Sequence, residues 1–284
     1  MAWIYDTYDL LHPGENNRPV VTGKPLDIGG SLGRLEATGL GCFFATTRFV
    51  DTAPLPGLES IEGATVAVQG FGNVGSVVAA AFAEAGAAVV AVSDTEGGVY
   101  NKSGLDLSAI TQNKASHGTV VGTPGTRTIT NDDLLCLQCD ILVPAALGDQ
   151  IRSDNADDIK AKLVVEAANR PVTPAADDIL AQRGIVVLPD ILANAGGVVV
   201  SYLEWVQNTE NQDWSLDRVN AELRRKMFDA VDSVVQYWRE ICPGSAGTVD
   251  PQPAPGLCRD MRTAALVLAI RRVANVTLQR GIWP

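Results

Sequence analysis

The stretch Ala64–Asp94, ATVAVQGFGNVGSVVAAAFAEAGAAVVAVSD, changes its hydrophobic period twice. A short apolar run, ATVAVQ, is followed by apolar residues at helical spacing from Val74 to Phe82, and Gly86 then supplies a helix stop. The second apolar run, AAVVAVSD, ends in an acidic residue, as expected of a buried parallel strand. The stretch therefore predicts one strand–helix–strand unit.

The same alternation continues toward the C-terminus. Short apolar runs at 140–146, 162–169 and 184–190 each end in polar or turn residues and are separated by segments of helix length. Alternating strands and helices predict an α/β fold of the Rossmann type, with a doubly wound, mostly parallel sheet that helices cover on both faces.

The turn after the first strand carries the glycine pattern GFGNVG at 70–75. Gly70 permits the turn, Gly72 lets the backbone approach a pyrophosphate, and Gly75 lets the helix pack close to the strand. The helix N-terminus offers free N–H groups to the anion. Asp94, about twenty residues further on, would accept hydrogen bonds from the adenosine ribose. The pattern predicts a dinucleotide site, and a glycine-rich turn that binds nothing is the alternative.

The residues around Asp94 favour one dinucleotide over the other. Glu96 lies beside it and no Arg is near, so a 2′-phosphate would meet repulsion. We therefore expect NAD as the cofactor and regard NADP as possible.

The chain turns helical after the sheet. An apolar helical face runs from Leu216 to Val235, a Pro/Gly-rich loop follows at Cys242–Gly256, and a final apolar helix covers roughly Met261–Arg280. We expect an entry or hinge segment at 1–45, an NAD(P)-binding domain at 46–205 and C-terminal helices at 206–284.

The composition excludes several kinds of partner. The chain has 33 acidic and 22 basic residues, a net charge of −11, and no Lys/Arg block, which excludes nucleic acid. No uncharged apolar stretch reaches the ~18 residues of a membrane span and no basic signal region is present, so we expect a cytoplasmic protein without a membrane partner. Cys136 and Cys139 form a CxxC, but only two His residues exist, so small apolar residues before a strand are favoured over a metal or redox site.

Four further segments resemble, in order, the glutamate/leucine/phenylalanine/valine dehydrogenase family. In that family they form the entry to the cofactor domain, the nicotinamide-side loop, the substrate-facing segment and the closing helix. They are TGKPLDIGGSLGRLEATGLG (22–41), VVEAANRPVTP (164–174), LPDILANAGGVVVSYLEW (188–205) and DMRTAALVLAIRRVA (260–274). The resemblance covers nearly the whole chain and implies an NAD(P)-dependent amino-acid dehydrogenase.

Carried over position by position, the resemblance implies a set of cofactor contacts in addition to the glycines. These residues are Thr38, Asn73, Val74, Ala145, Asn169 and Asn194. Asn169 and Asn194 each follow or border a strand end, where open α/β sheets bind ligands, and their amides can hold ribose or carboxamide groups. Turn chemistry beside Pro171 and Gly196 is the alternative for these two asparagines.

The resemblance also implies three residues on the substrate side. Arg34 lies at the cleft, although beside Glu36 it could instead hold an interdomain hinge. Ser201 corresponds to the serine that bonds the substrate's distal carboxylate in glutamate-specific members, and Val198 lines the same pocket. A hydroxyl suits a charged side chain, so glutamate is favoured over leucine, valine or phenylalanine. A helix serine bonded to its own backbone is the alternative.

The family's catalytic lysine, in a Gly-rich loop, and its proton-shuttling aspartate would precede the segments found here. Lys24, Lys102 and Lys114 are the lysines of the first half, and none lies in such a loop. We therefore expect the cofactor-binding half of a glutamate dehydrogenase, without a catalytic residue and inactive alone.

Two further expectations follow from the missing half. The face from Leu216 to Val235 should be partly uncovered, and the partner should be a complementary N-terminal domain or chain, with which a homo-hexamer could form. A non-catalytic NAD-binding module, a regulatory or assembly subunit, and a related leucine, valine or phenylalanine dehydrogenase fragment are the alternatives.

Overall fold

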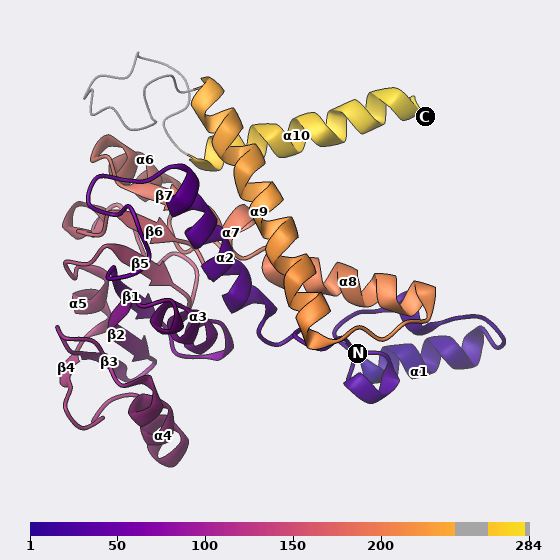
Figure 1. Cartoon of the computed structure of the whole chain (residues 1–284), viewed down its shortest axis with the longest axis horizontal. Helices are drawn as coiled ribbons and strands as arrows, with labels where there is room; N and C mark the ends of the chain where they lie inside the picture. Colours follow the sequence, from indigo (N-terminus) through magenta and orange to yellow (C-terminus); the bar gives the residue numbers. More distant parts are fainter. Residues whose placement is uncertain (242–260, 282–284) are drawn as a thin grey trace.

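The computed structural model describes residues 1–241 and 261–281, and the strands in them form one sheet (Figure 1). The strands are β1 (Thr65–Gln69), β2 (Ala88–Asp94), β3 (Gly97–Tyr100), β4 (Arg127–Ile129), β5 (Ile141–Pro144), β6 (Leu163–Val165) and β7 (Val186–Leu188). Their order is β4-β3-β2-β1-β5-β6-β7. The pairs β2–β1, β1–β5, β5–β6 and β6–β7 are parallel, which confirms the expected doubly wound α/β fold.

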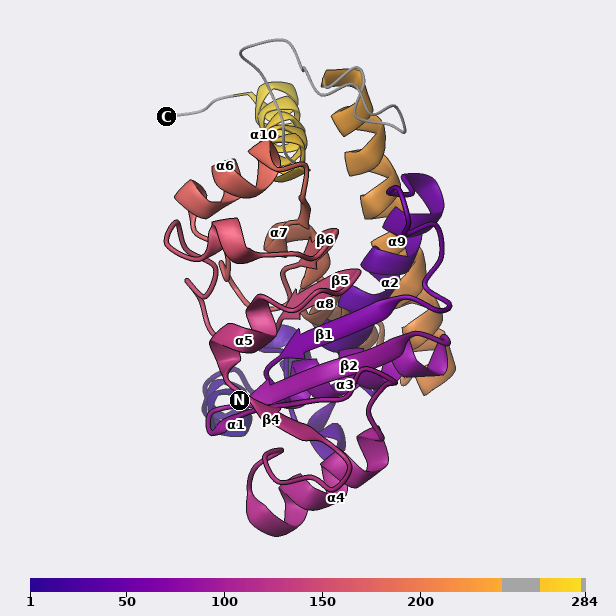
Figure 2. The same ribbon diagram turned by 90° about the vertical axis from the view of Figure 1, so that its left-hand side faces the viewer.

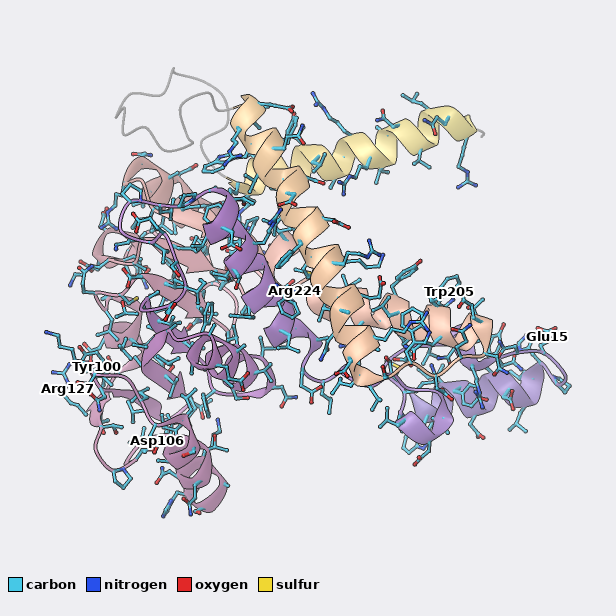
Figure 3. All side chains as sticks on the ribbon, in the orientation of Figure 1. Glu15, Tyr100, Asp106, Arg127, Trp205 and Arg224 are labelled. Carbon is cyan, nitrogen blue, oxygen red and sulfur yellow. The ribbon has the colours of Figure 1, made fainter. Side chains whose placement is uncertain are left out.

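The edge strand β4 and its neighbour β3 are the part of the sheet that the sequence did not predict. Both pair antiparallel with their neighbours. Their sequences, GGVY and RTI, are too short to show a period of two. Tyr100 and Arg127 lie together at this edge, with the guanidinium carbon 5.2 Å from the ring centroid (Figure 3). Pairing of β3 with β2, and of β4 with β3, therefore makes these residues strands.

Side chains alternate across the sheet and build a core on each face. Val66 and Val68 of β1 belong to one cluster and Ala67 to the other. The sheet lies between the two helical layers (Figure 2). The first layer contains α2 (Ala37–Thr52), α3 (Asn73–Glu84) and α9 (Leu216–Ile241), and the second contains α5 (Asn131–Leu135) and α6 (Pro174–Gln182).

The long helix α9 leaves Leu216 44% exposed but buries the rest of the face that we expected to be partly uncovered, so for that part the expectation was wrong. Its residues Val219, Leu223 and Met227 are at most 1% exposed, because α9 packs along α2. Arg48 of α2 also donates to both carboxylate oxygens of Asp232, at 2.7 Å each. Helix α2 of the same chain therefore covers this face, and the periodicity of α9 does not indicate which element packs against it.

The N-terminal segment packs against α8 (Gly196–Glu210), beside the sheet rather than over it (Figure 1). It contains α1 (Ala2–Leu11) and two 3-10 turns, Arg18–Val20 and Leu26–Ile28. Buried polar side chains of α8 bind its backbone. Asn208, for example, donates to the carbonyl of Gly29 at 2.7 Å. The segment is therefore attached by specific hydrogen bonds as well as by packing.

The remaining helices are α4 (Leu107–His117), the short α7 (Asp190–Ala193), α10 (Met261–Arg280) and a 3-10 turn at Ala156–Asp158. The last helix has the predicted bounds, and it extends away from the sheet (Figure 1). No described helix combines the length and apolarity that a membrane span requires. The predicted loop at Cys242–Gly256 lies outside the described residues.

Candidate functional site: a dinucleotide-binding edge

The glycine-rich turn between β1 and α3 has the geometry that its spacing predicts. Gly70 has a left-handed φ of +93°, and a Cβ there would lie 2.9 Å from the carbonyl oxygen of Ala145. A Cβ on Gly75 would lie 1.8 Å from the carbonyl oxygen of Gly70. A Cβ on Gly72 would meet no described atom within 4 Å. The backbone itself thus requires Gly70 and Gly75, whereas Gly72 faces open space.

The N-terminus of α3 and the end of β5 flank this turn. Gly72 is the N-cap of α3 and no side chain caps the helix, so its first N–H groups can receive an anion. Asn73 and Val74 form the first turn of the helix. Ala145 donates its N–H to the carbonyl of Gln69 at 2.8 Å. Because the strand order reverses between β1 and β5, these residues lie at the switch point where open α/β sheets bind ligands.

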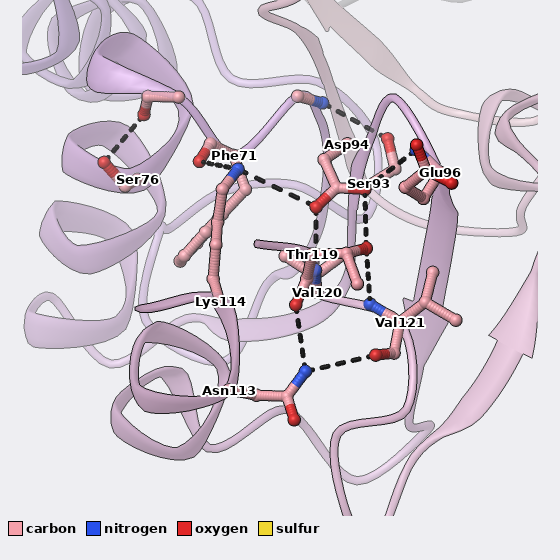
Figure 4. Close-up of polar contacts among 12 residues, drawn as sticks. Phe71, Ser76, Ser93, Asp94, Glu96, Asn113, Lys114, Thr119, Val120 and Val121 are labelled. Atoms are coloured by element: carbon pink, nitrogen blue, oxygen red, sulfur yellow. Dashed lines mark hydrogen bonds and ion pairs between the residues drawn. The ribbon is translucent and has the colours of Figure 1, made fainter. Parts of the chain in front are cut away.

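Asp94 ends β2, and its carboxylate is 8% exposed (Figure 4). It accepts hydrogen bonds from the N–H of Val120 at 2.7 Å and the hydroxyl of Thr119 at 3.0 Å. The ammonium of Lys114, on α4, lies 3.8 Å from the same carboxylate and donates to the carbonyl of Phe71 at 2.8 Å. Asp94 therefore also anchors the loop after α4, a structural role that the sequence did not predict.

The charge around Asp94 differs from the sequence-based expectation. That expectation counted Asp94 and the exposed Glu96, whose N–H donates to Asp94 at 3.1 Å. The structure adds the ammonium of Lys114 to this cluster (Figure 4). The two carboxylates and one ammonium leave this cluster with a net negative charge. That charge is smaller than the two negative charges that the sequence alone suggested.

The two asparagines predicted at strand ends come together in space. The side-chain NH₂ of Asn194 donates to the side-chain oxygen of Asn169 at 2.8 Å. Asn169 follows β6, and Asn194 ends α7, which follows β7. Arg170, next in the chain, adopts a left-handed φ of +47°. The exposed Asn169 and half-buried Asn194 keep further amide donors and acceptors for a ligand.

Thr38 lies where α2 crosses the start of α8. A Cβ on Gly197 would lie 2.6 Å from the hydroxyl oxygen of Thr38, and a Cβ on Gly41 would lie 2.7 Å from the Cα of Gly196. Only glycines permit this approach of the two helices. The crossing places Thr38 close to the start of α8, which follows Asn194 in the chain.

The three substrate-side residues lie on or beside α8. Ser201 and Thr22 form a hydrogen bond between their hydroxyls, and a bond from Ser201 to its own helix is not found among the described residues. Val198, three residues earlier, is 74% exposed. A Cβ added to Gly197 would lie 3.6 Å from Nη1 of Arg34, so this guanidinium lies beside the start of α8. The Nε of Arg34 is buried and has no hydrogen-bond partner among the described residues. Arg34 thus lies beside the same helix, α8, that carries Ser201 and Val198.

Lys24 is held in a buried ion pair. Its ammonium donates to Glu204 at 2.7 Å and to the carbonyl of Val21 at 2.6 Å, and both side chains of the pair are fully buried. Because the ammonium of Lys24 is buried in this ion pair, it cannot contact a substrate. The TGKP turn therefore carries a structural lysine.

Of the CxxC pair, Cys139 is buried in the core and Cys136 is partly exposed. Burial raises the pKa of Cys139 to about 12 and also raises the pKa of Cys136, so both thiols stay protonated at neutral pH. Residues 1–241 and 261–281 contain no group of three or more His, Cys, Asp or Glu that could hold a metal ion.

Two residues of the site were missed by the sequence reasoning. Thr22 lies within the TGKP segment, so its place in a family motif was the available signal. Lys114 lies on α4, and no spacing rule connects it with Asp94. Its proximity depends on how α4 packs.

Comparison with known proteins agrees with this geometry. The family described as Glutamate/Leucine/Phenylalanine/Valine dehydrogenase matches residues 29–281. The chain is 48% identical to a glutamate dehydrogenase of Thermotoga maritima and 46% identical to the NADP-specific glutamate dehydrogenase A1 of Halobacterium salinarum. Both alignments cover 100% of this chain and 64% of the relative, so the chain spans less than two thirds of their length.

A solved structure shows the same relationship. The hetero-hexameric glutamate dehydrogenase of Thermus thermophilus, in a leucine-bound form, superimposes with a TM-score of 0.84 at 34% identity. The alignment covers 100% of this chain and 62% of that one. From the matched residues, the identities and the shared fold, the chain belongs to the Glutamate/Leucine/Phenylalanine/Valine dehydrogenase family.

Proposed function

We propose that this chain is the NAD-binding part of a glutamate dehydrogenase. The observation that carries the proposal is that the glycine-rich turn, Asp94 and the Asn169–Asn194 pair converge at the carboxyl ends of the parallel strands. A bound dinucleotide would have its adenosine ribose at Asp94, its pyrophosphate at the N-terminus of α3 and its nicotinamide riboside near the two asparagines. Thr38 and Ala145 would lie along the nicotinamide half.

We propose NAD as the preferred cofactor, with NADP bound more weakly. Asp94 and Glu96 present two negative charges to the ribose 2′ position, whereas Lys114 supplies one positive charge. A 2′-phosphate would add negative charge to a cluster that is already net negative. Lys114 reduces this repulsion, which is why we expect weaker binding of NADP rather than none.

The reaction proposed for the complete enzyme is oxidative deamination of L-glutamate to 2-oxoglutarate and ammonia. When bound, NAD would supply the acceptor for the hydride lost from the glutamate Cα, and hydrolysis of the resulting imine by water would release 2-oxoglutarate and ammonia. The Ser201 and Thr22 hydroxyls would hold the distal carboxylate, and Arg34 would offer a cation to the substrate. The hydroxyl pair suits a carboxylate better than an aliphatic or aromatic side chain, which favours glutamate over leucine, valine or phenylalanine.

We propose that the catalytic acid–base groups come from a part of the enzyme outside these 284 residues. The chain covers 64% of the length of the glutamate dehydrogenases that it matches, and Lys24 is buried in its ion pair with Glu204. The chain would then supply cofactor binding and one wall of the substrate pocket. The division at residues 45 and 205, and a hexamer formed with the complementary part, belong to the same proposal.

Titration and turnover of the purified chain test these proposals. We expect saturable binding of NAD, no NADH formation from glutamate by the chain alone, and NADH formation when the complementary domain of a relative is added. General acid–base catalysis alone is worth roughly 10²–10⁴ in rate, and substrate orientation adds more, so the difference should be large. Turnover by the chain alone would contradict the assignment of the catalytic groups. Binding without recovery of turnover would support a non-catalytic NAD-binding module instead.

A further inference from the structure

Arg262, in the first turn of α10, forms ion pairs with three separate elements. Its Nη2 donates to Glu166 at 2.7 Å, its Nε to Asp177 at 2.6 Å, and its Nη1 lies 3.4 Å from Asp190. These carboxylates follow β6, lie on α6 and begin α7, respectively. One half-buried guanidinium therefore joins α10 to the ends of the last two strands.

Glu166 is the buried member of this cluster, with no exposed side-chain surface. Its carboxylate also accepts hydrogen bonds from the N–H of Asp190 at 2.7 Å and the N–H of Val172 at 3.3 Å. Burial raises the pKa of Glu166, and the hydrogen bond and charge of Arg262 oppose this rise. Arg262 thus favours the ionised form of Glu166, whose carboxylate contacts these two loops.

The same cluster reaches the asparagine pair. Asp190 accepts a hydrogen bond at 2.8 Å from the N–H of Arg170, the residue with left-handed φ next to Asn169. Asp190 also begins the single turn of α7 that ends at Asn194. The positions of Asn169 and Asn194 are therefore both set by carboxylates that Arg262 binds.

We infer that Arg262 is a positioning residue for the nicotinamide side of the cofactor site. It acts through Glu166 and Asp190, which hold the loops carrying Asn169 and Asn194, and it touches no cofactor itself. This inference rests on the proposed binding of NAD at these asparagines. It predicts that loss of Arg262 weakens the hold on the nicotinamide riboside and leaves the adenosine half, at Asp94 and the glycine-rich turn, unchanged.

The experiment compares NAD with ADP, which lacks the nicotinamide riboside, by calorimetric titration of the full chain. For Arg262→Met we expect the Kd of NAD to rise about tenfold, the scale of one lost hydrogen-bonded contact, with the Kd of ADP changed less than about twofold. Arg262→Lys retains the charge but not the planar fork, so its ratio of the two Kd values should be intermediate. Arg272→Met, at an exposed position on the same helix, is the matched control and should leave both Kd values unchanged.

A second variant separates positioning from folding, because Arg262→Met leaves the buried carboxylate of Glu166 without a positive partner. The double variant Glu166→Gln, Arg262→Met removes that charge, so its melting temperature should recover while the altered ratio of Kd values persists. An unchanged ratio in the folded double variant, or equal weakening of NAD and ADP, would overturn the inference. Failure of the wild type to bind NAD would instead overturn the proposed function, and the inference with it.

Discussion

Replacement of Lys114 by Met should weaken NADP more than NAD. The ammonium lies 3.8 Å from the carboxylate of Asp94, beside which a 2′-phosphate would lie. Taking roughly 4 Å for the separation of the ammonium from the 2′-phosphate as well, two unit charges interact by about 1 kcal/mol in water and about 4 kcal/mol at an effective dielectric constant of 20. Because Lys114 is partly exposed, we expect the lower part of this range, about 1–2 kcal/mol, or roughly a 5- to 30-fold rise in the Kd of NADP.

Removal of the negative charge of Asp94 should change the preference between NAD and NADP in the opposite direction. Asp94→Asn keeps an oxygen that can accept from Val120 or Thr119, whereas Asp94→Ala would release both. Loss of the charged acceptor should weaken NAD by roughly 1–2 kcal/mol. NADP should lose less, because the repulsion of its 2′-phosphate is removed at the same time. The two variants should therefore shift the preference between the cofactors in opposite directions.

The assay is titration of each variant with NAD and NADP at two salt concentrations. The NADP effect of Lys114→Met should decrease at higher salt, because exposed charges are screened. Lys102→Met, at an exposed turn after β3, is the control for loss of one positive charge and should not change either Kd beyond about twofold. If neither site variant alters the ratio of the two Kd values, the placement of the ribose at Asp94 is wrong.

Three further predictions concern substrate, stability and packing. With the complementary domain present, Ser201→Ala should reduce kcat/KM for glutamate more than for norvaline, which has no distal carboxylate, and equal losses would contradict the role of the hydroxyl. Asp140→Asn should lower the free energy of unfolding by about 1–3 kcal/mol at pH 7 in urea titrations. Burial raises the pKa of Asp140, but hydrogen bonds from Lys162 and neighbouring groups lower it below its ordinary value of 3.8 overall. The stabilisation is therefore complete above that pH and disappears as the pH falls through the lower folded pKa, and a stability difference that does not decrease as the pH falls below 3.8 would refute this. Gly75→Ala should lower the melting temperature because its Cβ would meet backbone at 1.8 Å, whereas Gly72→Ala should leave it unchanged and weaken NAD, and equal melting temperatures would refute the packing argument.

Local features of the chain were enough to predict the centre of the fold. The unit from β1 to β2 follows from apolar periodicity and from the spacing of Gly70 and Gly75, and both patterns lie within one short stretch of the chain. The strand-end positions of Asn169 and Asn194 were likewise predictable, because parallel strands all end at one edge of the sheet. The hydrogen bond between the two amides agrees with that expectation.

Contacts between distant residues were decided by the tertiary structure alone. The apolar face of α9 is covered because α2 packs along it, and no property of α9 itself indicates that partner. Lys114 reaches Asp94 only through the packing of α4, and Arg262 meets Glu166, Asp177 and Asp190 only because α10 begins beside β7. Periodicity and spacing record which way a side chain faces along its own element, whereas the distance between two charges depends on where every intervening element packs. The sequence by itself therefore determined that this chain has a dinucleotide-binding fold, and the tertiary structure decided which charges surround that site.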